Sequence, residues 1–275
     1  MDILGRLFSM PPVRKGIWRL WYPFLTRRLR DEDIVFLNYA FEEDPPVGLE
    51  LGEGDEADRC CIQLYHHVAT QAEVRDKAVL EVSCGHGGGA SWVTRALRPA
   101  SYVGLDLNPA GIAFCERRHQ VDGLRFVRGD AGQLPFEDEA FDVVINVEAS
   151  HCYPDFPTFL KEAARVLRPG GHLLYADFRF EGGTGFADWE RDLEGAPFEI
   201  TARRDISSEV RRGMEANAGR SARLVENCLP AFLRSLGRDF AGVPGGQVHD
   251  ALVAEELSYR SACLRKKASK SAGGG

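Results

Sequence analysis

Two neighbouring side chains in the middle of the chain have the chemistry to move a proton. Glu148 and His151 stand three residues apart in Val147-Glu148-Ala149-Ser150-His151-Cys152, directly after an apolar run. Histidine, with an unperturbed pKa of about 6.5, is well suited to act as a general base near neutral pH. We expect His151 to take a proton from the reacting molecule, with Glu148 as the alternative base or as the group that orients His151. The structural alternative is that His151 only holds its loop through a hydrogen bond.

A glycine-rich turn ahead of these residues predicts a ligand site. Residues 79–82 form a short apolar strand that leads into Ser83-Cys84-Gly85-His86-Gly87-Gly88-Gly89-Ala90, and a helical pattern follows. In an open α/β sheet this order lets a ligand touch the backbone, because glycine adopts positive φ and has no side chain. Asp106 ends the next strand about 20 residues further on, where a carboxylate accepts from the hydroxyls of a ribose. These features predict a nucleoside-binding site.

Two further acids argue against a dinucleotide and therefore against an oxidoreductase. Glu81 lies inside the strand before the turn, where its carboxylate suits a cationic or amine-bearing ligand rather than a pyrophosphate. A third strand, 124–127, leads into Gly129-Asp130-Ala131, and a fourth strand over 141–146 follows. As an ordered set, these motifs resemble those of class I S-adenosylmethionine (SAM) dependent methyltransferases, over residues 79–179.

The resemblance implies that SAM is the cofactor and S-adenosylhomocysteine the product. It places the methionine part against Glu81 and the backbone of residues 83–87, the ribose on Asp106, and the adenine against Leu107 and the Asp130-Ala131 step. Tyr65, on the buried side of a helix expected over 57–74, is a candidate cofactor contact or a tyrosine packed in the core. The family usually has glycine where Ser83 stands, so this turn is expected to be less open. The cofactor contacts expected are Tyr65, Glu81, Ser83, Gly85, Gly87, Asp106, Leu107, Asp130, Ala131 and Asn146.

The resemblance also implies the architecture: an α/β, Rossmann-like class I methyltransferase fold with a seven-stranded, mostly parallel sheet whose last strand is antiparallel. The order of helical and strand patterns agrees with this fold. Helices are expected from Pro109 and from Pro154, and the fifth strand over 172–178. Beyond a glycine-rich joint at 182–185, we expect a helical lid over 205–237, broken near Gly219. The last two strands are expected over 240–246 and 257–264.

The N-terminal region is expected to form a helical arm. Residues 13–30 combine aromatic and basic side chains, which suits packing on the core or on a second subunit, or a place in the acceptor pocket or at a membrane surface. We expect a homo-oligomer formed through this arm. The expected organisation is an arm and acidic loop over 1–56, a methyltransferase domain over 57–267 with a lid insertion at about 180–237, and a disordered tail over 268–275. The residues expected to bind the acceptor are Trp18, Trp21, Tyr22, Tyr39 and Tyr153.

Composition narrows the class of partner. The 275-residue chain has a formal net charge of −7, whereas nucleic-acid binders usually carry a basic surface. Its seven cysteines include no C-x-x-C pair and indicate reduced thiols, and the adjacent His66 and His67 point in different directions, so no metal site is expected. No apolar run is long enough to span a membrane. We expect a cytoplasmic protein without nucleic-acid partners or stable membrane insertion.

Several segments bear on the methyl acceptor. The Asn/Asp-Pro-Pro-aromatic motif of base-amino methylases is missing after the fourth strand, which favours a small molecule. Residues 39–46, 81–90, 147–154 and 256–260 are similar to the actinobacterial phthiotriol/phenolphthiotriol dimycocerosate methyltransferases, which are O-methylating enzymes of lipid biosynthesis. The same group resembles natural-product enzymes, including a C-methyltransferase that acts on a prenyl alkene. Two mechanisms on a large apolar small molecule of specialised metabolism follow: O-methylation with His151 as base, or C-methylation through a carbocation held by aromatic faces. The alternative function is a non-catalytic SAM-binding or scaffold protein.

Overall fold

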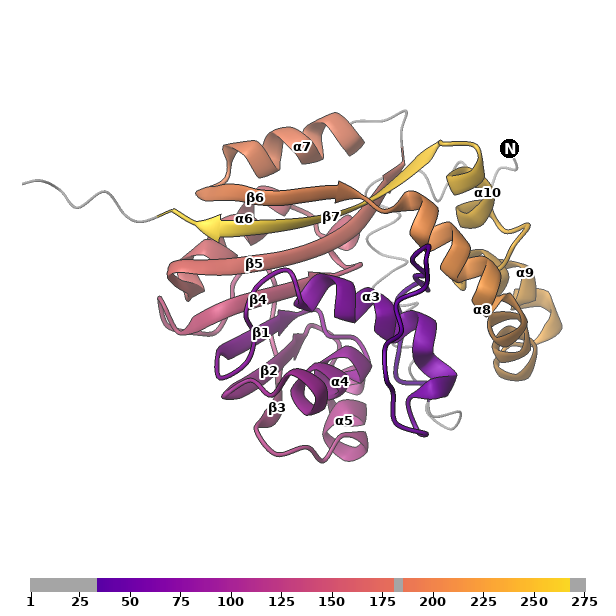
Figure 1. Ribbon diagram of the computed structural model, residues 1–275, viewed down its shortest axis with the longest axis horizontal. Coiled ribbons are helices and arrows are strands. Elements are labelled where there is room, and N and C mark those ends of the chain that lie inside the picture. The colour runs from indigo at the N-terminus through magenta and orange to yellow at the C-terminus, as the bar shows by residue number, and fades with distance from the viewer. Residues whose placement is uncertain (1–33, 181–184, 268–275) are drawn as a thin grey trace, which may run out of the picture.

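A single twisted sheet forms the centre of the computed structural model, which describes residues 34–180 and 185–267 (Figure 1). The strand order is β3-β2-β1-β4-β5-β7-β6. Strands β1 to β5 pair in parallel, whereas β7 runs antiparallel to both β5 and β6. The predicted seven-stranded, mostly parallel sheet with an antiparallel last strand is therefore confirmed. The strands are β1 (Ala78–Val82), β2 (Ser101–Asp106), β3 (Leu124–Arg128), β4 (Phe141–Val147), β5 (Leu167–Phe180), β6 (Phe198–Asp205) and β7 (Leu257–Lys266).

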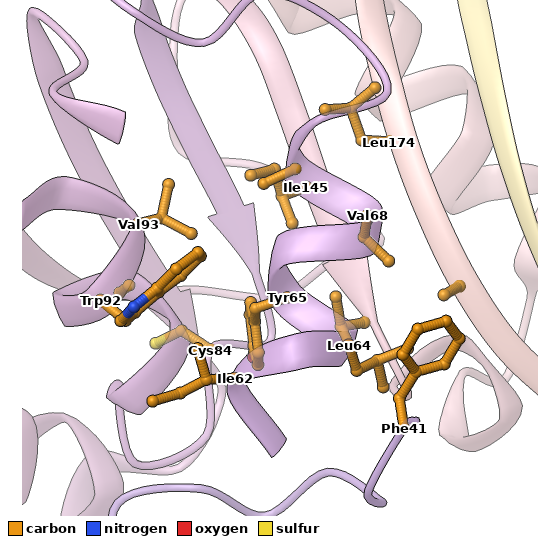
Figure 2. Packing of buried hydrophobic residues seen from close by; sticks show 14 of the residues in the cluster. Phe41, Ile62, Leu64, Tyr65, Val68, Cys84, Trp92, Val93, Ile145 and Leu174 are labelled. Atoms are coloured by element: carbon orange, nitrogen blue, oxygen red, sulfur yellow. The ribbon is translucent and has the colours of Figure 1, made fainter. Parts of the chain in front are cut away.

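Helices cover both faces of the sheet because its central strands are apolar on both sides. One hydrophobic cluster contains residues of α3, α4, α5, α8 and α10, and the cluster on the other face contains residues of α6 and α7. Figure 2 shows Ile62, Leu64, Tyr65 and Val68 of α3 in the first cluster, beside Ile145 of β4. The helices are α3 (Arg59–Ala69), α4 (Gly88–Leu97), α5 (Pro109–Arg118), α6 (Phe156–Val166), α7 (Gly185–Gly195), α8 (Ser207–Cys228), α9 (Arg234–Phe240) and α10 (Gln247–Val253), with short 3-10 turns at η1 (Glu56–Asp58), η2 (Ser150–Cys152) and η3 (Ala231–Leu233).

Side chains just before two helices fix where they begin. The Asn108 side chain accepts a hydrogen bond from the Ala110 N–H at the start of α5, and Pro109 occupies the first helical position. The Asp155 side chain accepts from the Thr158 N–H, so α6 begins at Phe156 and not at the expected Pro154. Such caps satisfy backbone donors that have no partner inside the helix. They also place η2, the turn that carries His151, between the end of β4 and α6.

Three expectations for the C-terminal half are wrong. Phe240 ends α9 and residues 241–246 form turns, and the strand at the edge of the sheet is β6, inside the range expected to belong to the lid. Helix α8 passes through Gly219 without a break and ends at Cys228, before Pro230. It continues because Val210, Met214 and Val225 are buried along its length. Helices α8, α9 and α10 thus follow β6 and precede β7 in the chain. In space they lie beyond the end of the sheet at which β6 ends (Figure 1).

Several expectations fall outside the described residues. These are the N-terminal arm with three of the aromatic residues expected to bind the acceptor, most of the joint before α7, and the tail. Among the residues that the structure describes, no helix is both long and apolar enough to cross a membrane, and no group of histidine, cysteine and acidic side chains is arranged to hold a metal ion. The expectations without a structural description are Trp18, Trp21, Tyr22, residues 182–184 of the joint and residues 268–275.

Candidate active site

A cavity of about 630 Å³ opens at the carboxyl ends of the parallel strands. The chain just past β1, β2, β3 and β4 contributes to its wall, and the segment 34–41, here called the cover segment, contributes residues 35–38. Small-molecule sites commonly have volumes of about 300–1,000 Å³, and open α/β sheets bind ligands at this edge. The cavity is therefore the candidate active site.

Two hydrogen bonds to backbone carbonyl groups of the cover segment attach it to the glycine-rich turn. The Gly88 N–H donates to the Val35 carbonyl at 3.0 Å, and the buried His86 ring donates through Nδ1 to the Ile34 carbonyl at 2.8 Å. A Cβ atom on Gly88 would lie 2.6 Å from the Val35 oxygen, so a larger residue there would push the segment away. One of the glycines thus serves to bring the cover segment down onto the turn.

The turn after β1 has the left-handed backbone that its composition predicts. Ser83, Gly85 and Gly87 have φ values of 63°, 56° and 76°. A Cβ on Gly87 would lie 2.8 Å from the Phe126 ring, which adds a steric requirement for glycine. Ser83 occupies a conformation that glycine adopts without cost, in agreement with the glycine that the family usually has at this position.

Asp106 ends β2 with its carboxylate at the cavity. Its oxygens accept from the Gly85 N–H at 2.9 Å and from the Asn108 N–H at 2.8 Å. Burial raises the pKa of Asp106 from its ordinary value, although these N–H groups lower it. A carboxylate fixed by two backbone donors has lone pairs left for a ligand diol.

The β3 side of the cavity is more open and partly apolar. Leu107 is 47% exposed although it is a large hydrophobic residue, and it lines the cavity with Asp130 and Ala131. One oxygen of Asp130 accepts from the Gly132 N–H at 2.8 Å. An exposed leucine next to an acid and a backbone N–H matches the contacts expected for an adenine ring.

Glu81 lies beneath the cavity rather than in its wall. Its side chain accepts from the Tyr65 hydroxyl and from the Tyr102 hydroxyl, both at 2.8 Å, and the residue is 1% exposed. Burial raises the pKa of Glu81 to about 7, although both tyrosines lower it. Tyr65, which does line the cavity, stands between Glu81 and any ligand, so the structure supports a role of Glu81 through Tyr65.

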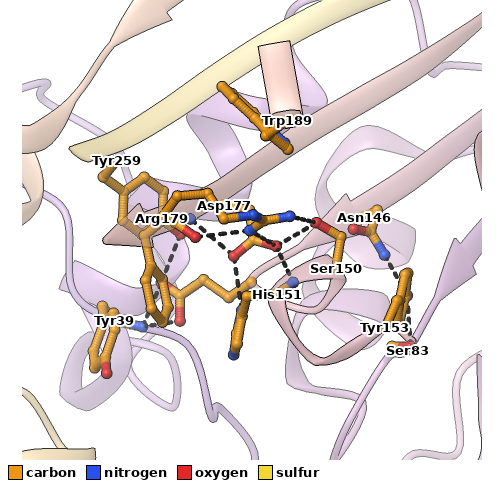
Figure 3. Close-up of polar contacts among 12 residues, drawn as sticks. Tyr39, Ser83, Asn146, Ser150, His151, Tyr153, Asp177, Arg179, Trp189 and Tyr259 are labelled. Atoms are coloured by element: carbon orange, nitrogen blue, oxygen red, sulfur yellow. Dashed lines mark hydrogen bonds and ion pairs between the residues drawn. The ribbon is translucent and has the colours of Figure 1, made fainter. Parts of the chain in front are cut away.

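Asn146 and Tyr153 connect the ends of β1 and β4. The Asn146 amide donates to the Val82 carbonyl at 2.9 Å and to the Tyr153 hydroxyl at 2.8 Å, and Tyr153 also bonds the Ser83 hydroxyl at 2.7 Å (Figure 3). The Asn146 carbonyl oxygen is buried and has no hydrogen-bond partner among the described residues. A buried acceptor of this kind favours a ligand donor, because leaving it unpaired costs about 1–3 kcal/mol.

His151 forms a pair with an acid on the neighbouring strand. Its Nδ1 lies 2.8 Å from Oδ1 of Asp177 in β5, and its ring packs on Phe178 with centroids 4.4 Å apart. Figure 3 shows the far edge of the ring pointing away from Asp177. Burial lowers the pKa of His151, but Cys152 and Asp177 outweigh it and raise the pKa to about 10.

Asp177 is a fully buried carboxylate that several donors hold in place. It accepts from the Ser150 hydroxyl at 2.6 Å and from the His151 N–H at 2.8 Å, and it lies 3.1 Å from the Arg179 guanidinium. Burial raises its pKa, but the charges of His151 and Arg179 outweigh burial and hold the pKa well below the ordinary value. Arg179 in turn lies over the rings of Phe156 and Trp189. The direction in which His151 points is therefore fixed by a rigid group of side chains.

Glu148 lines the cavity and has a different set of partners. Its carboxylate accepts from the Tyr39 N–H at 2.9 Å and from the Tyr259 hydroxyl at 2.6 Å. The acid that orients His151 is therefore Asp177, and Glu148 connects the cover segment to β7. Burial raises the pKa of Glu148 to about 8, although both partners lower it.

The cavity brings together most of the predicted cofactor contacts. Glu81, Gly87 and Asn146 lie behind its wall, His151 stands beside it next to the lining residue Cys152, and the Tyr39 ring packs on Phe178 rather than lining it. Asp177 and Tyr259 were missed by the sequence analysis, although an acid inside the apolar fifth strand was a signal for Asp177. Asn38 was missed too, and it lines the cavity with a carbonyl oxygen that has no partner among the described residues. The predicted residues that line the cavity are Tyr65, Ser83, Gly85, Asp106, Leu107, Asp130, Ala131, Glu148 and Tyr153.

Fold and cavity together define a class I SAM-dependent methyltransferase. Residues 80–175 match the family model described as a methyltransferase domain. The chain is 56% identical over 246 residues to the phthiotriol/phenolphthiotriol dimycocerosates methyltransferase of Mycobacterium leprae (strain TN), with 90% of each chain covered. It is 51% identical to the fatty-acid O-methyltransferase of Mycolicibacterium smegmatis, with 93% of this chain and 92% of that one covered. The chain belongs to the family of SAM-dependent methyltransferases that contains these enzymes.

The fold occurs in solved structures with cofactor product bound. The geranyl diphosphate C-methyltransferase from Streptomyces coelicolor A3(2), in complex with S-adenosyl-L-homocysteine, superimposes with a TM-score of 0.64 at 15% identity and covers 89% of this chain and 97% of that one. SAM is the cofactor of the present protein. The cavity lining fits it: Asp106 offers acceptors for a diol, Leu107 an apolar face for an aromatic ring, and Asn38 a carbonyl oxygen without a partner among the described residues for an amino group.

Proposed function

We propose that the protein transfers a methyl group to an oxygen atom of a large apolar small molecule, with His151 as the base. The observation that carries the proposal is the His151–Asp177 pair at 2.8 Å, set by β4 and β5 beside the cavity. In a hydroxyl acceptor, oxygen is the nucleophile, and losing its proton makes it a better one. A carboxylic acid has already lost its proton at neutral pH, so it can accept the methyl group without a base. An alkene acceptor has no such proton to lose before transfer.

The residues present suit this reaction. Bound SAM supplies a methyl carbon activated by a positively charged sulfur. The acceptor oxygen forms the new bond to that carbon, the carbon–sulfur bond breaks with its electron pair going to sulfur, and the acceptor proton goes to His151. Asp177 accepts the Nδ1–H, so the other ring nitrogen is the one presented to the acceptor, and it stabilises the imidazolium that forms. The remaining task of the protein is to align the two molecules and exclude water.

Two relatives support an apolar acceptor, and the name of the second also supports methylation on oxygen. One is named for phthiotriol and phenolphthiotriol dimycocerosates and the other for fatty acids, and each matches at least 90% of the present chain. Lipids with a hydroxyl or carboxyl group are accordingly the acceptors that we propose. The expected contacts of SAM with Tyr65, Asp106, Leu107, Asp130 and Ala131, and through them with the buried residues behind the wall, are part of the same proposal.

Replacing His151 by alanine tests the proposal. We expect methyl transfer to a long-chain diol to fall by about 10²–10⁴-fold, because the proton acceptor is lost. Transfer to a long-chain fatty acid should fall much less, because its carboxyl group is already ionised at neutral pH. His172→Ala is the matched control, since this histidine lies within β5 beside Val143 of β4 and not at the carboxyl end of β4, where His151 and the cavity lie, and it should keep the rate of the wild type. Because its raised pKa keeps most of His151 protonated at neutral pH, kcat/KM of the wild type for the diol should rise about tenfold per pH unit up to about pH 10.

The same assay identifies the alternative. If His151→Ala retains the rate while a prenyl alkene accepts the methyl group, then no proton is removed before transfer and C-methylation replaces our proposal. If the wild type binds S-adenosylhomocysteine but transfers no methyl group to any of these acceptors, the proposed acceptor class is wrong.

A further inference from the structure

The charged residues that line the cavity are mostly acidic. The described lining contains the carboxylates of Asp106, Asp130 and Glu148 and one guanidinium, that of Arg128. His86 also lines the cavity, but burial lowers its pKa and favours the neutral ring. Such a cavity attracts a cation more strongly than a neutral molecule of the same shape.

Glu148 stands apart from the other carboxylates of the cavity. Arg128 and Asp130 belong to the chain that leaves β3, and Asp106 is fixed by two backbone N–H groups. Glu148 follows β4, and its hydrogen-bond donors are the Tyr39 N–H and the Tyr259 hydroxyl, which are dipoles and not full charges. Among the described residues no lysine or arginine forms an ion pair with it.

The groups that face Glu148 leave its charge poorly balanced. Asp177 on β5 raises its pKa and His151 on η2 lowers it, so these two charges oppose one another. Tyr65 and Cys61 face it from α3, and the pKa of each is raised, so both are neutral at pH 7. Burial is the larger effect and raises the pKa of Glu148 to about 8, so that a cation entering the cavity would favour the ionised form.

The backbone at Glu148 provides an independent indication. Its φ is 49°, in the left-handed region that a non-glycine residue adopts at a cost. That conformation turns the side chain to meet both the cover segment and β7. Backbone strain of this kind persists where the surrounding structure imposes it, and it is concentrated at functional sites.

We propose that Glu148 makes the cavity distinguish the positively charged sulfonium cofactor from its neutral thioether product. The sulfonium adds a positive charge to a cavity whose charged lining is mostly acidic, and Glu148 is ionised in that complex. After methyl transfer the positive charge has left the sulfur, and Glu148 regains a proton. The product is then held less tightly than the cofactor, which favours exchange of one for the other. This assignment rests on the cavity as the site of SAM and does not depend on which acceptor is methylated.

Calorimetric titration tests the assignment without turnover. SAM, S-adenosylhomocysteine and sinefungin, an analogue with an ammonium group in place of the sulfonium, are titrated at pH 6.0 and 8.5. At pH 8.5 we expect the wild type to bind both cations about tenfold more tightly than S-adenosylhomocysteine, and at pH 6.0 to show a smaller ratio. At pH 7, titrations in two buffers with different ionisation enthalpies should show proton release on binding of either cation and none on binding of the thioether.

Glu148→Gln keeps the size of the side chain and an acceptor for the Tyr39 N–H, but it cannot be ionised. We expect the affinity ratio to fall to about one and the proton release to disappear. Glu255→Gln is the matched control, because Glu255 is an exposed glutamate with a similar φ of 57° and is not part of the cavity lining. It should behave as the wild type.

An unchanged affinity ratio and unchanged proton release in Glu148→Gln would overturn the assignment. If that variant fails to fold, equal affinities for cation and thioether at pH 8.5 in the wild type would overturn it equally. If the affinity ratio and the proton release depend on Glu148 but no methyl group is transferred to lipids, the assignment of Glu148 stands and the proposed acceptor is rejected. The failure of this assignment and the failure of the proposed function are thus distinguishable.

Discussion

Asp177→Asn is the substitution that most directly probes the group of side chains behind the candidate base. The Asp177 side chain is fully buried and carries the charge that balances both Arg179 and His151. Asparagine has nearly the same shape, but it carries no charge and only one oxygen to share among these donors. Removing one partner of a buried charge pair leaves the others without compensation and costs about 3–5 kcal/mol. We expect a loss of that size in the free energy of unfolding.

The loss should depend on pH in a defined direction. The pKa of Asp177 lies below its unfolded value, so its contribution is present above about pH 4 and is lost as the pH falls through the lowered pKa. The pKa of His151 is raised, so its contribution is complete below about pH 6.5 and is lost as the pH rises through about 10. The difference between wild type and variant should therefore be largest between these limits and shrink from pH 6.5 towards pH 10, where only Arg179 still opposes the charge.

Urea unfolding at pH 6, 8 and 9.5 measures both effects. Asp138→Asn is the matched control, because Asp138 also pairs with an arginine but its side chain is 75% exposed, and an exposed pair contributes at most about 1 kcal/mol. In activity, the variant should move the acidic limb of the pH–rate profile to lower pH, since His151 loses the charge that raises its pKa. A destabilisation below about 1 kcal/mol, or one that is constant from pH 6 to pH 9.5, would refute this account of the pair.

Two further substitutions test the buried acids beneath and beside the cavity. Glu81 has its pKa raised to about 7, so it stabilises the fold fully below its unfolded pKa and less as the pH rises through about 7. Glu81→Gln should therefore flatten the fall in unfolding free energy between about pH 5 and pH 8. A fall as steep as that of the wild type would show that Glu81 is not the source of this pH dependence. Asp106→Asn should weaken S-adenosylhomocysteine binding by at least about tenfold in calorimetric titration, because hydrogen bonds to a charged group contribute about 1.5–3 kcal/mol each; an unchanged affinity would place the ribose elsewhere.

The parts of the site that sequence reasoning predicted are those that depend on neighbouring residues. The turn from Ser83 to Gly87 and Asp106 at the end of β2 belong to one strand–turn–helix–strand unit. Their spacing in the sequence therefore predicts that they lie close together in the fold. The partner of His151 lies 26 residues away on β5, and nothing in the local sequence joins them. Likewise, the hydrogen bond between Tyr259 and Glu148 spans 111 residues and exists only because β7 lies against β5.

The errors in the C-terminal half have a physical cause. Strand β6 is an edge strand whose residues are mostly exposed and include Arg203, Arg204 and Asp205, so it lacks the apolar alternation that reveals buried strands. Gly219 weakens a helix locally, but the buried residues on either side of it keep α8 continuous. In both places tertiary packing outweighs local preference.

The central claim is that the methyl group of SAM ends on an oxygen atom of an apolar acceptor. Incubating the wild-type protein with SAM carrying a ¹³C-labelled methyl group and a long-chain diol, followed by carbon NMR of the product, measures this directly. The account predicts one new signal, from a methyl carbon bonded to oxygen, that is reduced in His151→Ala. A labelled methyl carbon bonded to carbon, or unlabelled acceptor in the presence of bound cofactor, would contradict it.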